Sequence, residues 1–229
     1  MAISLQGSST STGLSTTPSL IAPSGGVSGD LMIVMVTHNN GTSTVVDNNG
    51  ATPCSEDIDT GNDAGGQGQA IYSRVLGASE PGTYNFTLSS SERWVTIGFT
   101  VTGWDGSTKY DLAPATPANF ETTTSAPTCP GGTTVTNNAW VIATAQTDGV
   151  GNGTFTAGPT GYTEILRQAG TQPAAVYYID QATAGTTGDA DFTISVAGNN
   201  MAQRLFAIKP AVAGGQTFFG FRTLTGVGI

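Results

Sequence analysis

The chain has 229 residues, of which only 10% are charged, and its 16 acidic against 7 basic side chains give a net charge of -9. A chain this acidic repels a polyphosphate, so its composition argues against nucleic-acid binding. The 32 glycines, together with many threonines and serines, favour strands joined by tight turns, and the length is sufficient for a large buried core.

The N-terminal residues, MAISLQGSSTSTG, lack the basic and apolar regions of a secretory signal. The longest apolar run, residues 31–36, is far too short to span a bilayer. We therefore expect a protein made in the cytoplasm that has no membrane partner.

The run LMIVMV at 31–36 is apolar on both of the faces that alternate along a strand, as is AWVIA at 139–143. An antiparallel strand with one wet face would alternate apolar and polar residues, so both runs need cover on two sides. The cover could be a second sheet and a long loop of the same chain, or a neighbouring subunit in a trimer or other oligomer. The single histidine, His38, follows the first run without a catalytic or metal motif around it, and we expect it at the surface.

The stretch EDIDTGNDAGG carries alternate carboxylates on a glycine-bearing loop. Asp57, Asp59 and Asp63 could gather a calcium ion, but the spacing departs from that of an EF-hand, and a solvated acidic turn is the favoured interpretation. No other cofactor is expected. Cys54 and Cys129 both lie in proline-containing connections, where two free thiols or one disulfide would fit.

Residues 83–101 alternate apolar and polar side chains around a short loop, LSSSER, which predicts a β-hairpin. The Asn-Gly pair in DNNG at 47–50 predicts a tight turn. No segment shows a sustained helical period with caps, so we expect an all-β protein without a long helix.

Several segments recur at an offset of about 105 to 108 residues, including AIYSRV on AVYYID, Glu56 on Glu164, Phe86 on Phe192 and Phe99 on Phe206. This repetition predicts an antiparallel double-sheet sandwich of about ten strands, jelly-roll-like, built from two duplicated units of four or five strands. The expected organisation is a first β unit at 1–104, a proline-containing crossover link at 105–128, a second β unit at 129–210 that packs against the first, and a spacer with an apolar end at 211–229.

The last segment has no counterpart in the first half and is rich in apolar residues, which are Phe218, Phe219, Phe221, Leu224, Val227 and Ile229. Because leaving so many apolar side chains in water is costly, the segment should dock, either on its own domain or on a neighbouring subunit or scaffold. The remaining large aromatic residues are expected to pack in the core or in an interface, although sugar binding is the alternative; they are Trp94, Trp104, Trp140, Tyr162, Tyr177 and Tyr178.

The motifs GDLMIVMV and AIYSRVLGASEPGTYNFTLSSSERWVTIGFTVTGWD, followed by YD, give residues 19–209 a resemblance to bacteriophage virion proteins and related bacterial surface repeats. The resemblance implies a non-enzymatic structural protein located in the virion. It would be a capsid decoration or cement protein that binds the major capsid protein or other virion proteins as a homo-oligomer, with a trimer favoured. The alternative is a receptor-binding tail or fibre module that recognises a host glycan through exposed aromatic residues and the acidic loop.

Overall fold

The computed structural model describes residues 2–39, 43–59, 66–114, 119–148, 153–170, 172–195 and 198–212. Within these ranges the protein is all-β, contains no helix and is built from antiparallel sheets, as the sequence predicts. The described part of the chain accordingly offers no helical segment able to cross a bilayer.

The first half of the chain forms one large sheet and one small sheet. The large sheet has the order β1-β8-β3-β6-β5 and consists of β1 (Ser4–Ser15), β8 (Glu92–Thr102), β3 (Leu31–His38), β6 (Gly68–Val75) and β5 (Ser55–Asp59). The small sheet has the order β2-β7-β4 and consists of β2 (Ser19–Ile21), β7 (Thr83–Leu88) and β4 (Val45–Asp47).

The second half has a large sheet with a corresponding order, β10-β20-β13-β16-β15. Its strands are β10 (Asn119–Thr124), β20 (Gly198–Ile208), β13 (Ala139–Asp148), β16 (Ala174–Gln181) and β15 (Thr163–Gln168), and β9 (Tyr110–Leu112) also pairs with β20. Three two-stranded ladders cover its outer face: β11 (Thr128–Cys129) with β18 (Ala190–Asp191), β12 (Thr133–Thr134) with β17 (Gly185–Thr186), and β14 (Phe155–Ala157) with β19 (Thr193–Ile194).

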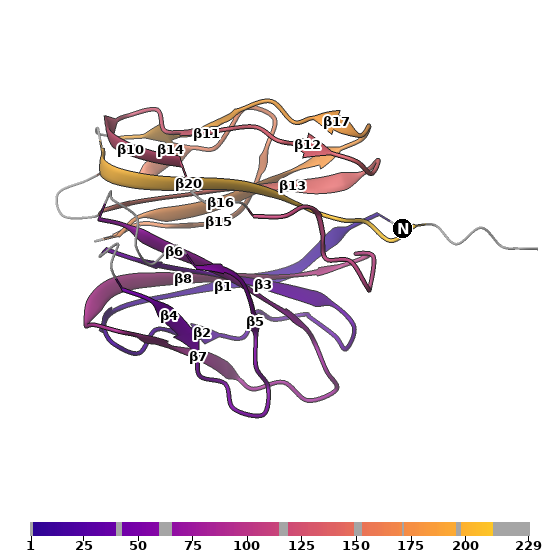
Figure 1. Cartoon of the computed structure of the whole chain (residues 1–229), viewed down its shortest axis with the longest axis horizontal. Helices are drawn as coiled ribbons and strands as arrows, with labels where there is room; N and C mark the ends of the chain where they lie inside the picture. The colour runs from indigo at the N-terminus through magenta and orange to yellow at the C-terminus, as the bar shows by residue number, and fades with distance from the viewer. Residues whose placement is uncertain are drawn as a thin grey trace, which may run out of the picture.

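The sheets stack in four layers (Figure 1). The two large sheets lie in the middle and share one apolar core, in which Ile33 and Phe99 of the first sheet join Trp140 and Phe206 of the second. The small sheet of the first half and the ladders of the second half form the two outer layers, each with its own core against the neighbouring large sheet. The molecule is therefore a β-sandwich whose central sheets are covered on both faces.

This layering explains the runs that are apolar on both faces. Leu31, Ile33 and Met35 of β3 belong to the central core, whereas Met32 and Val34 belong to the outer core of the first half. The chain itself therefore covers both faces of β3. The jelly-roll-like wiring, the duplication and the oligomeric state remain predictions.

One expectation about a connection, the hairpin at 83–101, is wrong. Residues 83–88 and 92–102 do not form a hairpin, because β7 belongs to the small sheet and β8 to the large one. Both strands alternate apolar side chains in the same way, and this local pattern does not say which sheet a strand joins. The stretch expected to be a link, 105–128, carries the strands β9 and β10, both of which pair with β20.

The two halves are tied together where each ends. The backbone of Trp104 forms a β-bridge with Pro210 of the second half, while its side chain is held within the first half by a hydrogen bond from Nε1 to the Gly29 carbonyl at 2.9 Å. The Ala211 amide donates to the Gly103 carbonyl at 2.8 Å. Gly103 has φ of 79°, and a Cβ there would lie 2.2 Å from the Ala2 carbonyl oxygen, so this junction requires glycine.

Candidate functional site

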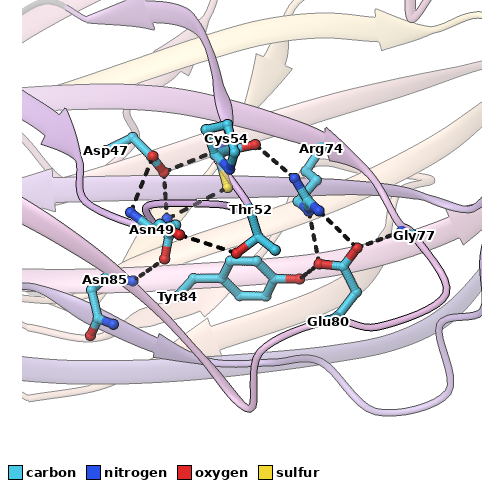
Figure 2. A network of polar contacts seen from close by, with 10 residues as sticks. Asp47, Asn49, Thr52, Cys54, Arg74, Gly77, Glu80, Tyr84 and Asn85 are labelled. Atoms are coloured by element: carbon cyan, nitrogen blue, oxygen red, sulfur yellow. Dashed lines mark hydrogen bonds and ion pairs between the residues drawn. The ribbon is translucent and has the colours of Figure 1, made fainter.

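A network of polar contacts lies at the corner between β6 and β7, which contains the EPGTY motif (Figure 2). Arg74 donates to both carboxylate oxygens of Glu80, from Nε at 2.8 Å and from Nη2 at 3.1 Å. The Tyr84 hydroxyl donates to Glu80 at 2.7 Å, and the Gly77 amide is a further donor to the same carboxylate. Glu80 is thus the shared acceptor that closes the corner.

These donors determine the electrostatics of the corner. Burial of Glu80 opposes ionisation, but the hydrogen bonds from Arg74, Gly77 and Tyr84 outweigh it, so the pKa of Glu80 is lowered. Burial, followed by the hydrogen bond to Glu80, raises the pKa of Tyr84. A carboxylate held ionised by a cation and two further donors is suited to fixing a chain turn rather than to proton transfer.

Beside this corner, the turn that follows β4 holds Cys54. Asp47 accepts a hydrogen bond from the Cys54 amide at 3.1 Å, and Asn49 uses its side-chain oxygen to accept one from the Asn85 amide at 2.7 Å. The predicted Asn-Gly turn is present here, with Gly50 at a φ of 56°. Burial, with Asp47 nearby, raises the pKa of the Cys54 thiol to about 12, so this thiol is not a ready nucleophile.

Neither cysteine forms a disulfide, and both are buried. Cys54 lies in the outer core of the first half and Cys129 in that of the second half, on opposite sides of the central sheets. Of the two alternatives left open by the sequence, the structure therefore has two separate thiols and no disulfide between them.

The predicted calcium ligands are not brought together. Asp57 forms an ion pair with Lys109 and accepts a hydrogen bond from the Tyr110 hydroxyl at 2.6 Å, whereas Asp59 accepts one from the Val45 amide at 2.8 Å. A β-bulge lies between Glu56 and Ile58 in β5, so it reverses the alternation of the strand. As a result Asp57 and Asp59, two residues apart, point to opposite faces of the sheet.

The third predicted calcium ligand, Asp63, lies outside the described residues. Within the described ranges, no group of three or more metal-ligating side chains could hold an ion. What the structure does show at this place is a polar seam between the two halves. Burial, with the charge of Asp57, raises the pKa of Tyr110 well above its usual value, so this phenol remains a hydrogen-bond donor.

His38 is not a surface residue, contrary to our expectation. It lies at the end of β3 with no exposed surface, opposite Trp94 and Gly68 in the neighbouring strands. A Cβ at Gly68 would lie 1.9 Å from the imidazole, so glycine at that position makes the space for the ring.

A buried polar cluster between the two large sheets was not anticipated from the sequence. Arg204 donates from Nε to Gln69 Oε1 at 2.9 Å, and Gln146 donates from Nε2 to the Gly68 carbonyl at 2.9 Å. Both bonds join β6 of the first half to strands of the second half. Such bonds fix how the two sheets are aligned, because a shifted alignment would leave buried polar groups unpaired.

The large aromatic residues pack in the interior, as expected. Trp94, Trp104, Trp140 and Tyr177 are buried, and Trp140 stacks on Tyr178 with 3.8 Å between ring centroids. The exposed large apolar side chains within the described ranges are all aliphatic; they are Leu14, Ile21, Val27, Val46, Val75, Val135 and Val212.

An open hollow of about 580 Å³ lies where the described chain ends. Its lining includes the exposed side chains of Val135 and Val212, together with Ala2, Pro210 and Ala211. The predicted partner-binding residues Phe218, Phe219, Phe221, Leu224, Val227 and Ile229 lie outside the described residues. The lining of the hollow therefore includes the last described residues before that apolar segment.

The chain was compared with protein-family models, curated proteins and solved structures, and none of the three comparisons gave a match.

Proposed function

We propose that this chain is a non-enzymatic structural protein of a bacteriophage particle, namely a capsid decoration or cement protein. In this proposal the β-sandwich is a rigid body that lies on the assembled shell as a homo-oligomer. The apolar segment that contains Phe218 to Ile229 anchors it to the major capsid protein or to another virion protein. The observation that carries the proposal is that Pro210, Ala211 and Val212, which follow the interior strand β20, line the open hollow, and that the apolar sequence comes shortly after them along the chain.

The chemistry of the described clusters supports a structural role. Glu80 accepts hydrogen bonds from Arg74 and Tyr84. Asp57 forms an ion pair with Lys109 and accepts a hydrogen bond from Tyr110. In both clusters the ionised groups stabilise chain corners or the seam between the halves. The EPGTY motif, which contributes to the resemblance to virion proteins, therefore has a structural task in this chain.

Stabilisation of the shell would follow from mass action. A protein that binds the assembled lattice but not its free subunits stabilises the lattice by RT ln(1 + [L]/Kd) per site. A rigid sandwich suits this task because little conformational entropy is lost when it binds.

We also propose that the two halves are copies of one ancestral unit with a jelly-roll-like arrangement. Both large sheets have the corresponding strand order. Glu56 lies opposite Tyr72, and its carboxylate accepts a hydrogen bond from that hydroxyl at 3.4 Å; Glu164 and Tyr177 repeat this pairing at 2.9 Å. In both strands a β-bulge follows the glutamate immediately, which unrelated strands would rarely share.

The proposal is tested by removing residues 213–229 and mixing the truncated and full-length chains with particles of the encoding phage that lack this protein. We expect the truncated chain to retain its circular dichroism spectrum and melting temperature but to lose sedimentation with the particles. Cosedimentation equal to that of the full chain would contradict anchoring by this segment.

The alternative, glycan recognition by a tail or fibre module, would need aromatic side chains at the surface. The tryptophans, which would be the strongest sugar platforms, are buried here. We therefore favour the decoration protein, and calcium-dependent binding on a glycan array would reverse that preference.

A further inference from the structure

Strand β1 forms an unusual edge of the first large sheet. It spans the 12 residues Ser4–Ser15, and none of them is buried. Its only strand partner within the described ranges is β8, and none of the backbone hydrogen bonds outside the sheets involves it. One side of β1 therefore presents unused backbone donors and acceptors.

Natural proteins usually protect such an edge with charged residues, proline or a short length. The sequence of β1, SLQGSSTSTGLS, contains neither charge nor proline. By contrast, the opposite edge strand, β5, carries three carboxylates within five residues, SEDID. The acidic chain thus leaves its longest edge without electrostatic protection.

The neighbouring edge on the same side of the molecule is also neutral overall. The Ser8 hydroxyl of β1 donates to the Ile165 carbonyl of β15 at 3.3 Å, which places the two edges one above the other. β15 carries one acidic and one basic residue, Glu164 and Arg167, which form an ion pair with 3.5 Å between Glu164 Oε2 and Arg167 Nε. A second copy of this acidic chain can therefore approach this side with less repulsion than it would meet at β5.

The backbone groups of β1 that face outward can be identified from β8. Arg93 exchanges hydrogen bonds with Asn39, its amide donating to the Asn39 side chain and its carbonyl accepting from the Asn39 amide, so its backbone points toward β3. Because this direction alternates along a strand, Trp94, Thr96, Gly98 and Thr100 point toward β1. The residues of β1 opposite these four are bonded to β8, and the residues between them point outward; the outward-facing residues are Ser8, Thr10, Thr12 and Leu14.

We propose that two copies of this chain pair through β1, antiparallel and about a two-fold axis, so that their first large sheets join into one continuous sheet. The regular part of β1, beyond the bulge between Leu5 and Gly7, runs to Ser15 and has Ser11 at its middle. With the axis at Ser11, the backbone of Thr10 bonds to that of the partner's Thr12, and Ser8 bonds to the partner's Leu14. The pairing gives the outward donors and acceptors partners and covers Leu14, which is 68% exposed in the single chain.

The first test is the mass of the isolated full-length chain by light scattering at micromolar concentrations. We expect twice the single-chain mass of 23.2 kDa. A monomer, or a trimer such as the sequence suggested, would overturn the two-fold pairing.

The second test traps the interface with a disulfide. In the proposed register the two Ser11 residues form a non-hydrogen-bonded pair with Cα atoms about 4.5 Å apart, within disulfide range. Ser11→Cys should therefore give a covalent dimer on mild oxidation, whereas Ser9→Cys, on the same face, should not, because its two copies would be separated by about 13 Å along the strands. Equal cross-linking of both variants would contradict the register. The native Cys54 and Cys129 are buried and do not compete for the oxidant.

The third test removes one outward donor. Thr12→Pro should raise the dimer Kd by about tenfold or more, because proline removes the amide that donates to the partner and places its ring in the interface. The matched control, Thr12→Ala, retains the amide and should remain a dimer. Edge strands tolerate proline, so the melting temperature of the proline variant at high dilution should match that of the control. An unchanged Kd would overturn the proposal.

These outcomes are independent of the particle-binding test. The interface uses β1, whereas anchoring uses residues 213–229. A Thr12→Pro variant that is monomeric but still binds particles weakly would therefore support this interface and the anchor separately.

Discussion

The corner that follows β6 in the first half is held by an ion pair, whereas the corner that follows β16 in the second half is held by backbone pairing and hydroxyl groups. In the first, Arg74 and Tyr84 converge on Glu80. In the second, β12 pairs with β17, and Thr187 accepts a hydrogen bond from the Gly132 amide at 2.9 Å. The strand order of the large sheets is the same in both halves, so that order does not depend on how its outer corners are closed.

The largest expected loss of stability concerns a feature that the two outer layers share. In each of them a buried phenylalanine packs against a tyrosine. Phe86 lies 5.1 Å from Tyr72 and Phe192 lies 5.8 Å from Tyr177, measured between ring centroids. We expect Phe86→Ala and Phe192→Ala each to lower the free energy of unfolding by about 3–5 kcal/mol, because each leaves a large cavity. Urea denaturation measures both losses. A loss below about 1 kcal/mol at either site would mean that the two outer cores do not contribute equally to the free energy of unfolding.

The next effect tests how much the ion pair at the first corner contributes, compared with an exposed ion pair in the second half. Glu80→Gln should lower the free energy of unfolding by about 1.5–3 kcal/mol, because it weakens charged hydrogen bonds between the Arg74 and Glu80 side chains, which are each 16% exposed. The matched control is Glu164→Gln in the second half. The side chains of Arg167 and Glu164 are 35% and 42% exposed, so the expected loss in the free energy of unfolding is below about 1 kcal/mol. Equal losses at both positions would mean that the ion pair at the first corner contributes no more than an exposed ion pair.

A pH effect should follow from the same corner. The pKa of Glu80 is lowered from 4.5, so its contribution is present above that pH and is lost as the pH falls through the folded-state value. The free energy of unfolding of the wild type should therefore fall on acidification below about pH 4.5. Glu80→Gln should show a shallower fall over the same range in urea titrations, and parallel curves for the two proteins would rule out this source of acid sensitivity.

The smallest effect is kinetic and concerns the thiols, one in each outer core. Burial raises the pKa of Cys54 to about 12, and Cys129 has no exposed surface. We expect both to react with a thiol reagent only as fast as the protein opens, so labelling followed by mass spectrometry should give the two cysteines similar, slow rates. Rapid labelling of one alone would show that its half opens locally.

The sequence predicted the features that depend on which side chains are apolar. The runs at 31–36 and 139–143 indicated strands covered on both faces, and β3 and β13 lie between two cores. The tryptophans were expected to be buried, and they are. These predictions succeeded because burial of apolar area determines them directly.

The features that depend on pairing were not predictable in the same way. The strand β1 has no apolar alternation because it is an edge with no buried residue, so its serine- and threonine-rich sequence resembles a loop. His38 was expected outside because nothing near it in the sequence indicates that Gly68 makes space for it from the next strand. The separation of Asp57 from Asp59 arises from a bulge, which spacing along the chain does not reveal.

The position of β20 has a mechanical consequence. It is an interior strand that pairs with β13 along one side and with β9 and β10 along the other, and the bridge between Trp104 and Pro210 secures its end. Tension applied through residues 213–229 would pull β20 along its own axis, so the bonds on both sides, which run across that axis, would bear the load together rather than open one after another. A tether attached here would resist force in shear, whereas the same tether on an edge strand could be peeled away.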